Sequence, residues 1–97
     1  MYSVTQSQID DFARDGAVCL PGLFADWVDV IKDGIAANMK DPGPYAAENL
    51  QAGEAGRFFD DYCNWQRIPA FADVMASSPA PAAAATLMQS QTAQFFH

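Results

Sequence analysis

His97 is the first candidate for a functional side chain in this 97-residue chain, because it is the only histidine. It follows the strand-like run TAQFF. An imidazole can hold a metal ion, but a metal site requires three or four converging ligands. The two cysteines, Cys19 and Cys63, lie far from it in the sequence. Carboxylates would have to complete the set. We therefore interpret His97 as a strand residue and predict no metal site complete within this chain.

Asp60 and Asp61 form a carboxylate pair between aromatic residues. Adjacent side chains on a helix or a strand point in different directions, so the two carboxylates should not converge on one ion or one proton. A solvated face or a helix cap is therefore favoured over acid–base catalysis. Further along the chain, Arg67 follows Trp65 and Gln66 and could grip a carboxylate through two hydrogen bonds. In so acidic a chain, we expect Trp65 to pack and Arg67 to pair with a surface acid.

The two cysteines could act as nucleophiles only if a nearby base or cation lowered the thiol pKa. Neither Cys19 nor Cys63 has such a neighbour in the sequence, and neither belongs to a CxxC pair. Both stand among apolar residues, which predicts buried free thiols in a reducing cytoplasm. The chain contains no phosphate-binding loop, GxSxG, HExxH or EF-hand pattern.

The charge balance excludes several classes of partner. The formal net charge is −7, and the five Lys and Arg residues are scattered. Binding to nucleic-acid phosphates or anionic lipid headgroups requires clustered basic residues, so we expect neither nucleic acid nor membrane as a partner. The opening run MYSVTQSQIDD lacks the basic region and apolar core of a signal peptide, and no apolar run reaches membrane-spanning length. These features predict a cytoplasmic protein.

The elements that must position these side chains begin with a helix over 6–15. Thr5 and Gln8 fit a capping box, and Gly16 can adopt the left-handed conformation that ends a helix. The apolar run AVCL at 17–20 predicts a short buried strand. Pro21 and Gly22 then end that strand.

A second helix is predicted over 27–40, with Asp26 as its N-cap. Its apolar stripe contains Val28, Ile31, Ile35 and Met39, while Gly34 should cost stability relative to alanine. The run DPGP ends this helix. The stretch 45–56 reads as a loop with at most one helical turn. The aromatic stretch 57–66 fits either a helix or a strand.

Two more helices and a strand complete the predicted order. Pro69 suits the first turn of a helix over 68–78. The run 77–89 is either a Pro/Ala linker or a helix, and Ser78 as cap with prolines confined to the first turn favours the helix. The segment 90–97 reads as a strand. Because isolated strands leave backbone groups unpaired, we expect them to join a sheet whose other members are missing from this chain.

The order of these elements resembles the N-terminal part of the phytanoyl-CoA dioxygenase family of non-haem Fe(II)- and 2-oxoglutarate-dependent oxygenases. Three stretches carry the likeness: TQSQIDDFARDGAVCLPGLF, NWQRIPAFADVMASSPAPAAAATLMQ and QTAQFFH. The resemblance implies an α+β fold in which N-terminal helices and strands flank a double-stranded β-helix core of jelly-roll or cupin-like type. It also implies that residues 1–97 are a single partial domain, with most of that core absent.

The resemblance implies that the parent enzyme uses Fe(II) and 2-oxoglutarate to hydroxylate a small organic substrate. The family's iron is held by two histidines and a carboxylate, beginning with a His-x-Asp motif. This sequence has no His-x-Asp, so no catalytic residue, metal ligand or cofactor ligand is assigned, and the chain alone is expected to bind no cofactor and to be inactive. Its expected partners are the rest of the β-helix core and, in the parent, the substrate.

In the predicted final strand, Gln94 and Phe96 share one face, opposite Ala93, Phe95 and His97. We assign Gln94 and Phe96 to the wall of the substrate pocket, since a glutamine beside an aromatic ring suits such a wall. A second interpretation stays open: a free-standing small acidic helical protein that binds a partner through its apolar face.

Overall fold

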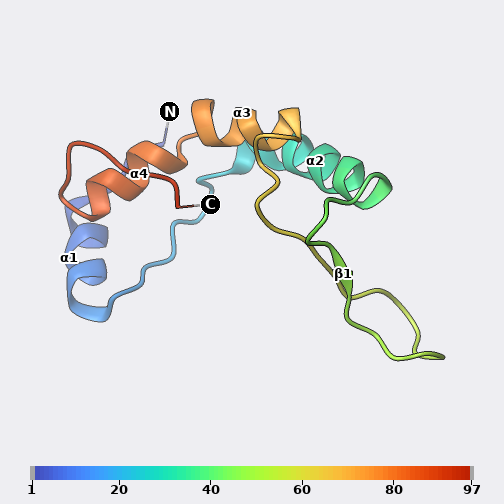
Figure 1. Cartoon of the computed structure of the whole chain (residues 1–97). Helices are drawn as coiled ribbons and strands as arrows, with labels where there is room; N and C mark the ends of the chain where they lie inside the picture. Colours follow the sequence, from blue (N-terminus) through green and yellow to red (C-terminus); the bar gives the residue numbers. More distant parts are fainter. Residues whose placement is uncertain (1, 97) are drawn as a thin grey trace.

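Four α-helices and one short antiparallel hairpin make up the ordered backbone in the computed structural model, which describes residues 2–96 (Figure 1). The elements in chain order are α1 (Gln6–Asp15), the 3-10 helix η1 (Ala25–Trp27), α2 (Val28–Lys40), β1 (Ala47–Glu48), β2 (Phe59–Asp60), α3 (Pro69–Ser77) and α4 (Ala80–Leu87). The chain is thus a small mixed helix and strand structure. None of the helices within 2–96 is long and apolar enough to cross a bilayer.

Helix α1 confirms the capping signals in its sequence. The hydroxyl of Thr5 accepts a hydrogen bond from the backbone N–H of Gln8 (3.2 Å), and the Gln8 side chain accepts one from the N–H of Thr5 (2.9 Å). At the other end, Gly16 has a φ of 74° and its N–H donates to the carbonyl of Phe12. Because both ends are set by local contacts, the predicted bounds equal the observed ones.

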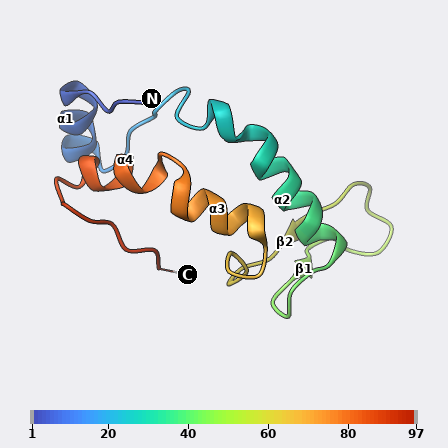
Figure 2. The same ribbon diagram turned by 90° about the horizontal axis from the view of Figure 1, so that it is seen from above.

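Helices α2 and α3 lie side by side, and Gly34 is the reason they approach closely (Figure 2). A Cβ atom at Gly34 would lie 2.5 Å from Cε1 of Phe71 and 3.2 Å from Cβ of Ala70. The buried glycine therefore makes room for the Phe71 ring. Gly34 lowers the helix propensity of α2, as predicted, but its lack of a side chain is what allows the two helices to approach so closely.

The apolar stripe predicted on α2 is only partly covered, because Ile31 and Met39 are half-buried whereas its other two residues are exposed. Gly34 and Asn38, one turn apart, are the buried positions of the helix. Val28 and Ile35 from the stripe are 50% and 47% exposed. The fully buried positions of α2 are thus one small and one polar residue, while Val28 and Ile35 leave part of its apolar side open.

The helices form an open arc rather than a closed bundle. Contacts run from α2 to α3, from α3 to α4 and from α4 to α1. The buried hydrophobic residues in the described range are Ile68, Val74 and Ala83. The radius of gyration is 16.2 Å, whereas a compact domain of this length has about 13 Å. A large continuous core is therefore absent from residues 2–96.

The hairpin of β1 and β2 projects away from the helices (Figure 1). Ala47 pairs with Asp60 and Glu48 with Phe59 in antiparallel register. The rings of Tyr45 and Tyr62 stack beside the pairing, with centroids 4.9 Å apart. The segments that sequence patterns predicted as a loop and as an ambiguous aromatic run thus contain the two paired strands.

Two other predicted strands are wrong. Residues 17–20 and 90–96 have no strand backbone, and His97 lies outside the described residues. A β-leaning run becomes a strand only when a neighbour pairs with its backbone, and neither segment has such a neighbour within 2–96.

The helix starts divide in the same way. Pro69 begins α3, as predicted. The hydroxyl of Ser78 accepts from the N–H of Ala80 (3.2 Å), but the N-cap of α4 is Pro79, not Ser78 as predicted, and it makes no side-chain cap hydrogen bond. The run 80–87 is helical, which decides against the linker. The prediction for Asp26 is wrong: this residue lies inside η1, and α2 begins at Val28 without a side-chain cap. The 3-10 turn continues directly into α2, so no separate capping position exists there.

Candidate functional site

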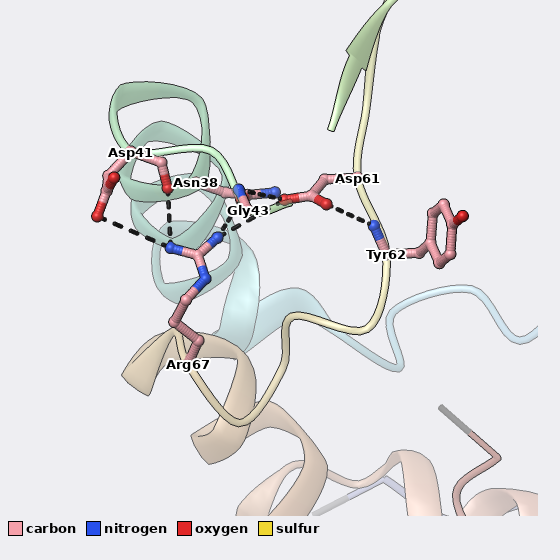
Figure 3. A network of polar contacts seen from close by, with 6 residues as sticks. All are labelled: Asn38, Asp41, Gly43, Asp61, Tyr62 and Arg67. Carbon is pink, nitrogen blue, oxygen red and sulfur yellow. Dashed lines mark hydrogen bonds and ion pairs between the residues drawn. The ribbon is translucent and has the colours of Figure 1, made fainter. Parts of the chain in front are cut away.

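The densest polar cluster of the described chain surrounds the guanidinium of Arg67 (Figure 3). Nη1 of Arg67 donates to the backbone carbonyl of Asp41 (2.8 Å) and lies 3.9 Å from its carboxylate. Nη2 donates to Oδ1 of Asn38 (3.0 Å) and lies 3.6 Å from Oδ2 of Asp61. We call Asn38, Asp41, Asp61 and Arg67 the Arg67 clasp. It ties the C-terminal end of α2 to the segment between β2 and α3.

Asp61 is the anchor of the clasp on the hairpin side. Its side chain is 0% exposed, and its carboxylate accepts hydrogen bonds from the N–H groups of Gly43 (3.0 Å) and Tyr62 (2.9 Å). Burial raises the pKa of the Asp61 carboxyl, but these two backbone hydrogen bonds, the Asn64 side chain and the charge of Arg67 outweigh burial. The net result is a pKa below its ordinary value, so Asp61 is a stable anion near neutral pH.

Local structure positions each member of the clasp. Asn38 is a buried residue in the last turn of α2, and Asp41 is the C-cap residue of that helix. A cation is favoured at this end because the last helix carbonyls carry partial negative charge. The sequence prediction that Arg67 pairs with an acid is confirmed. The clasp is a positioning device, because its polar groups are turned toward one another.

The acid pair divides between two environments. Asp60 accepts a hydrogen bond from the side chain of Asn49 across the hairpin, whereas Asp61 enters the clasp. The two carboxylates therefore do not share a ligand or proton. This agrees with the expectation that adjacent acids point apart, although Asp61 is buried rather than part of a solvated face.

Both cysteines are exposed, which contradicts the prediction of buried thiols. Cys19 stands in the irregular segment 17–20, which has no sheet to cover it. Cys63 has a left-handed backbone with a φ of 56° and lines a hollow of about 260 Å³ with Trp65, Gln66 and Phe96. The apolar neighbours of both cysteines in the sequence predicted that a core would cover the thiols. The described residues form no such core around them.

The tail after α4 separates the two residues assigned to a pocket wall. Gln94 lines a hollow of about 300 Å³ formed with α3 and α4, whereas Phe96 lines the hollow at Cys63. Because 90–96 is not a strand, the argument that Gln94 and Phe96 share one strand face does not hold here. Phe95 stands between the hollows and lines both. Its ring packs edge to face on Trp65, with centroids 5.5 Å apart.

Sequence reasoning assigned no role to Phe95, because it expected a strand with this side chain on the opposite face. The prediction that Trp65 packs is confirmed, and Phe95 is its ring partner. The one available signal was the repeated aromatic pair at 95 and 96, which does not say which ring packs. Only the path of the tail along α4 and α3 decides that.

Within residues 2–96, no three His, Cys, Asp or Glu side chains stand close enough to hold a metal ion. The described residues therefore do not fit the iron site of the family that the sequence resembles, and His97 lies outside them. Comparison with known proteins found no matching family model, curated protein or solved structure.

Proposed function

We propose that this chain is the N-terminal structural segment of a non-haem Fe(II)- and 2-oxoglutarate-dependent dioxygenase that hydroxylates a small organic substrate. Its role is to support a double-stranded β-helix core supplied by the rest of that enzyme, which would also bind Fe(II) and 2-oxoglutarate. The resemblance to the phytanoyl-CoA dioxygenase family motivates this assignment. No catalytic step is assigned to residues 2–96, because their side chains do not form a metal site.

The observation that carries the proposal is the amount of apolar surface left uncovered. None of the large residues in the described range is completely buried, and nine large hydrophobic residues are exposed. They are Phe24, Val28, Ile35, Tyr45, Phe58, Tyr62, Met88, Phe95 and Phe96. Apolar surface of this extent on a small chain commonly marks the place where another body packs.

The open stripe of α2 is the clearest such surface. An amphipathic helix ordinarily turns its apolar stripe to a core, yet Val28 and Ile35 are about half exposed while Gly34 and Asn38 face inward. The helix thus has α3 on one side and an apolar side available for a second layer. The outer face of a sheet would provide that layer in the proposed enzyme.

The alternative function is a free-standing acidic module that binds a separate protein through the same stripe. The uncovered surface favours both functions equally, since it reports a missing neighbour and not the identity of that neighbour. The two functions differ in whether the neighbour is encoded in the same reading frame.

The deciding experiment is to determine the coding sequence downstream of the His97 codon. We expect an open frame that continues into a His-x-Asp motif and a second histidine. Co-expression of residues 1–97 with that downstream polypeptide should then give a soluble complex. A stop codon directly after His97 would overturn the dioxygenase assignment and leave the binding module.

A matched pair of variants tests the stripe itself. Val28→Ser with Ile35→Ser should lower the fluorescence of the dye ANS bound to the isolated chain and abolish the complex, while far-UV circular dichroism keeps its helical signal. The control variant is Ala36→Ser with Ala37→Ser, at exposed positions of the same helix. It should leave the ANS fluorescence and the formation of the complex unchanged. An isolated chain that melts cooperatively as a compact monomer without binding ANS contradicts the need for a neighbour.

A further inference from the structure

Another hollow lies away from the Arg67 clasp, where the N-terminal residues and η1 meet the junction of α3 and α4. Its volume is about 470 Å³, within the range in which proteins hold small ligands, about 300–1,000 Å³. The residues lining it are Tyr2, Gly22, Leu23, Asp26, Trp27, Ser77, Ser78 and Pro79. We call it the Asp26 hollow. It combines one carboxylate, two aromatic rings and two hydroxyl groups.

Most polar side chains that line the Asp26 hollow make no hydrogen bond or ion pair within residues 2–96. Within residues 2–96, Asp26 makes no ion pair or hydrogen bond through its side chain, and the same holds for the side chains of Tyr2, Trp27 and Ser77. Ser78 alone is engaged, since its hydroxyl oxygen accepts from the N–H of Ala80. A carboxylate, a phenol, an indole N–H and a hydroxyl thus remain available to a ligand.

The charge of the hollow favours a cation. All three arginines are occupied by other acids: Arg14 by Asp11 and Asp15, Arg57 by Glu48, and Arg67 in its clasp. Helix α3 ends at Ser77 and α4 begins at Ala80, so opposite ends of two helix dipoles meet there and largely offset each other. Among the described residues, no basic side chain lines the hollow and Asp26 is its one carboxylate. The net charge of −7 adds to this negative charge at longer range.

We propose that the Asp26 hollow is a binding site for a small organic cation, an alkylammonium or quaternary ammonium group. Asp26 supplies the counter-charge, and the rings of Trp27 and Tyr2 supply the faces on which such cations bind through cation–π attraction. Leu23 and Pro79 contact the apolar body of the ligand. An inorganic cation would use the carboxylate alone, and a neutral molecule would use the rings alone.

The test is a titration of the full 97-residue chain with tetramethylammonium chloride at constant ionic strength, followed by tryptophan fluorescence. Trp65→Phe, remote from the hollow, leaves Trp27 as the reporting indole. We expect a saturable change with a dissociation constant on the order of 1 mM, the scale available to so small a ligand. Sodium chloride and tert-butanol, the inorganic cation and a neutral molecule of similar shape, should give no saturable change.

Matched variants identify the hollow as the place of binding. Asp26→Asn should weaken tetramethylammonium binding at least about tenfold, because the counter-charge is lost. Asp33→Asn changes the net charge equally, at an exposed position on α2 that does not line the hollow, and should change binding less than about twofold by the long-range field alone. Equal effects of the two variants, an equal response to tert-butanol, or no saturation in the parent chain would overturn the proposal.

Discussion

The crossing of α2 and α3 and the tail after α4 differ in how many of their side chains find contacts within the chain. At the crossing, Gly34 gives space to the Phe71 ring, and Arg67 joins both sides through paired polar groups. In the tail, residues 91–96 are all exposed, and Phe95 touches Trp65. The first region completes its contacts within the chain. The second has a strand-like sequence without a neighbouring strand, so its conformation depends on what lies beside it.

Substitution of Gly34 should break the crossing and have the largest effect. Gly34→Ala should lower the free energy of unfolding by about 2 kcal/mol, because the new methyl group overlaps the Phe71 ring. Helix propensity alone predicts the opposite sign, a gain of about 1 kcal/mol. Urea denaturation followed by circular dichroism measures the change. Ala37→Gly, at an exposed position of the same helix, is the control for propensity, and a more stable Gly34→Ala variant would refute the close crossing.

Removal of the clasp cation should come next. Arg67→Ala should lower the free energy of unfolding by about 2 kcal/mol, because Asn38 and Asp61 lose a charged partner. The control is Arg57→Ala, which breaks the exposed pair with Glu48 and should cost less than about 1 kcal/mol. Thermal melts of both variants give the ranking. Equal shifts in the two melts would show that the clasp is no more than a surface ion pair.

Acid should loosen the clasp through Asp61. The folded-state pKa of Asp61 lies below its ordinary value of 3.8, so its stabilisation is present in full above that value and is lost as pH falls through the lower, folded-state pKa. Stability should therefore be flat near neutral pH and decline below about pH 4. Asp61→Asn should reduce this decline, as measured by melts across the acid range.

The control for this acid response is Asp15→Asn. The hydrogen bond from Arg14 lowers the pKa of Asp15 as well, but Asp15 is on the surface. Its removal should change the acid decline less than Asp61→Asn does. A decline that begins near pH 6 would point to a group other than these carboxylates.

The tail contact should give the smallest effect. Phe95→Ala should lower the free energy of unfolding by less than about 1 kcal/mol, which is the scale of a single aromatic pair. In a Trp27→Phe background, the Trp65 emission should shift to longer wavelength as the ring loses its cover. Phe58→Ala removes an equally large exposed ring on the hairpin and should leave this emission unchanged. An unshifted Trp65 emission spectrum for Phe95→Ala would contradict the contact between the Phe95 and Trp65 rings.

Sequence patterns predicted best where the contacts that form an element are local. The Thr5 and Gln8 capping box and Gly16 set the bounds of α1, and Pro69 marks the start of α3, because each acts within one helical turn. The same reasoning failed for the strands at 17–20 and 90–96, whose pairing partners cannot be local. It also missed that Gly34 and Asn38 are the buried positions of α2, whereas Val28 and Ile35 from the predicted stripe are exposed.

The candidate sites show the same division. Residue types alone predicted that Arg67 would pair with an acid. Its partners Asn38, Asp41 and Asp61 lie 6–29 residues away in the sequence and meet it only in the folded chain. The Asp26 hollow gave no sequence signal, because its lining comes from the N-terminal residues, from η1 and from the junction of α3 and α4.

The sequence by itself determined the four helices and the net charge of −7, since these depend on neighbours in the chain and on composition. Tertiary structure decided that Gly34 and Asn38 face inward, that the Asp61 side chain is buried beside Arg67, and that Val28 and Ile35 on α2 stay exposed. The physical reason is that helix formation is settled within a few residues, whereas burial and pairing depend on which distant segments meet.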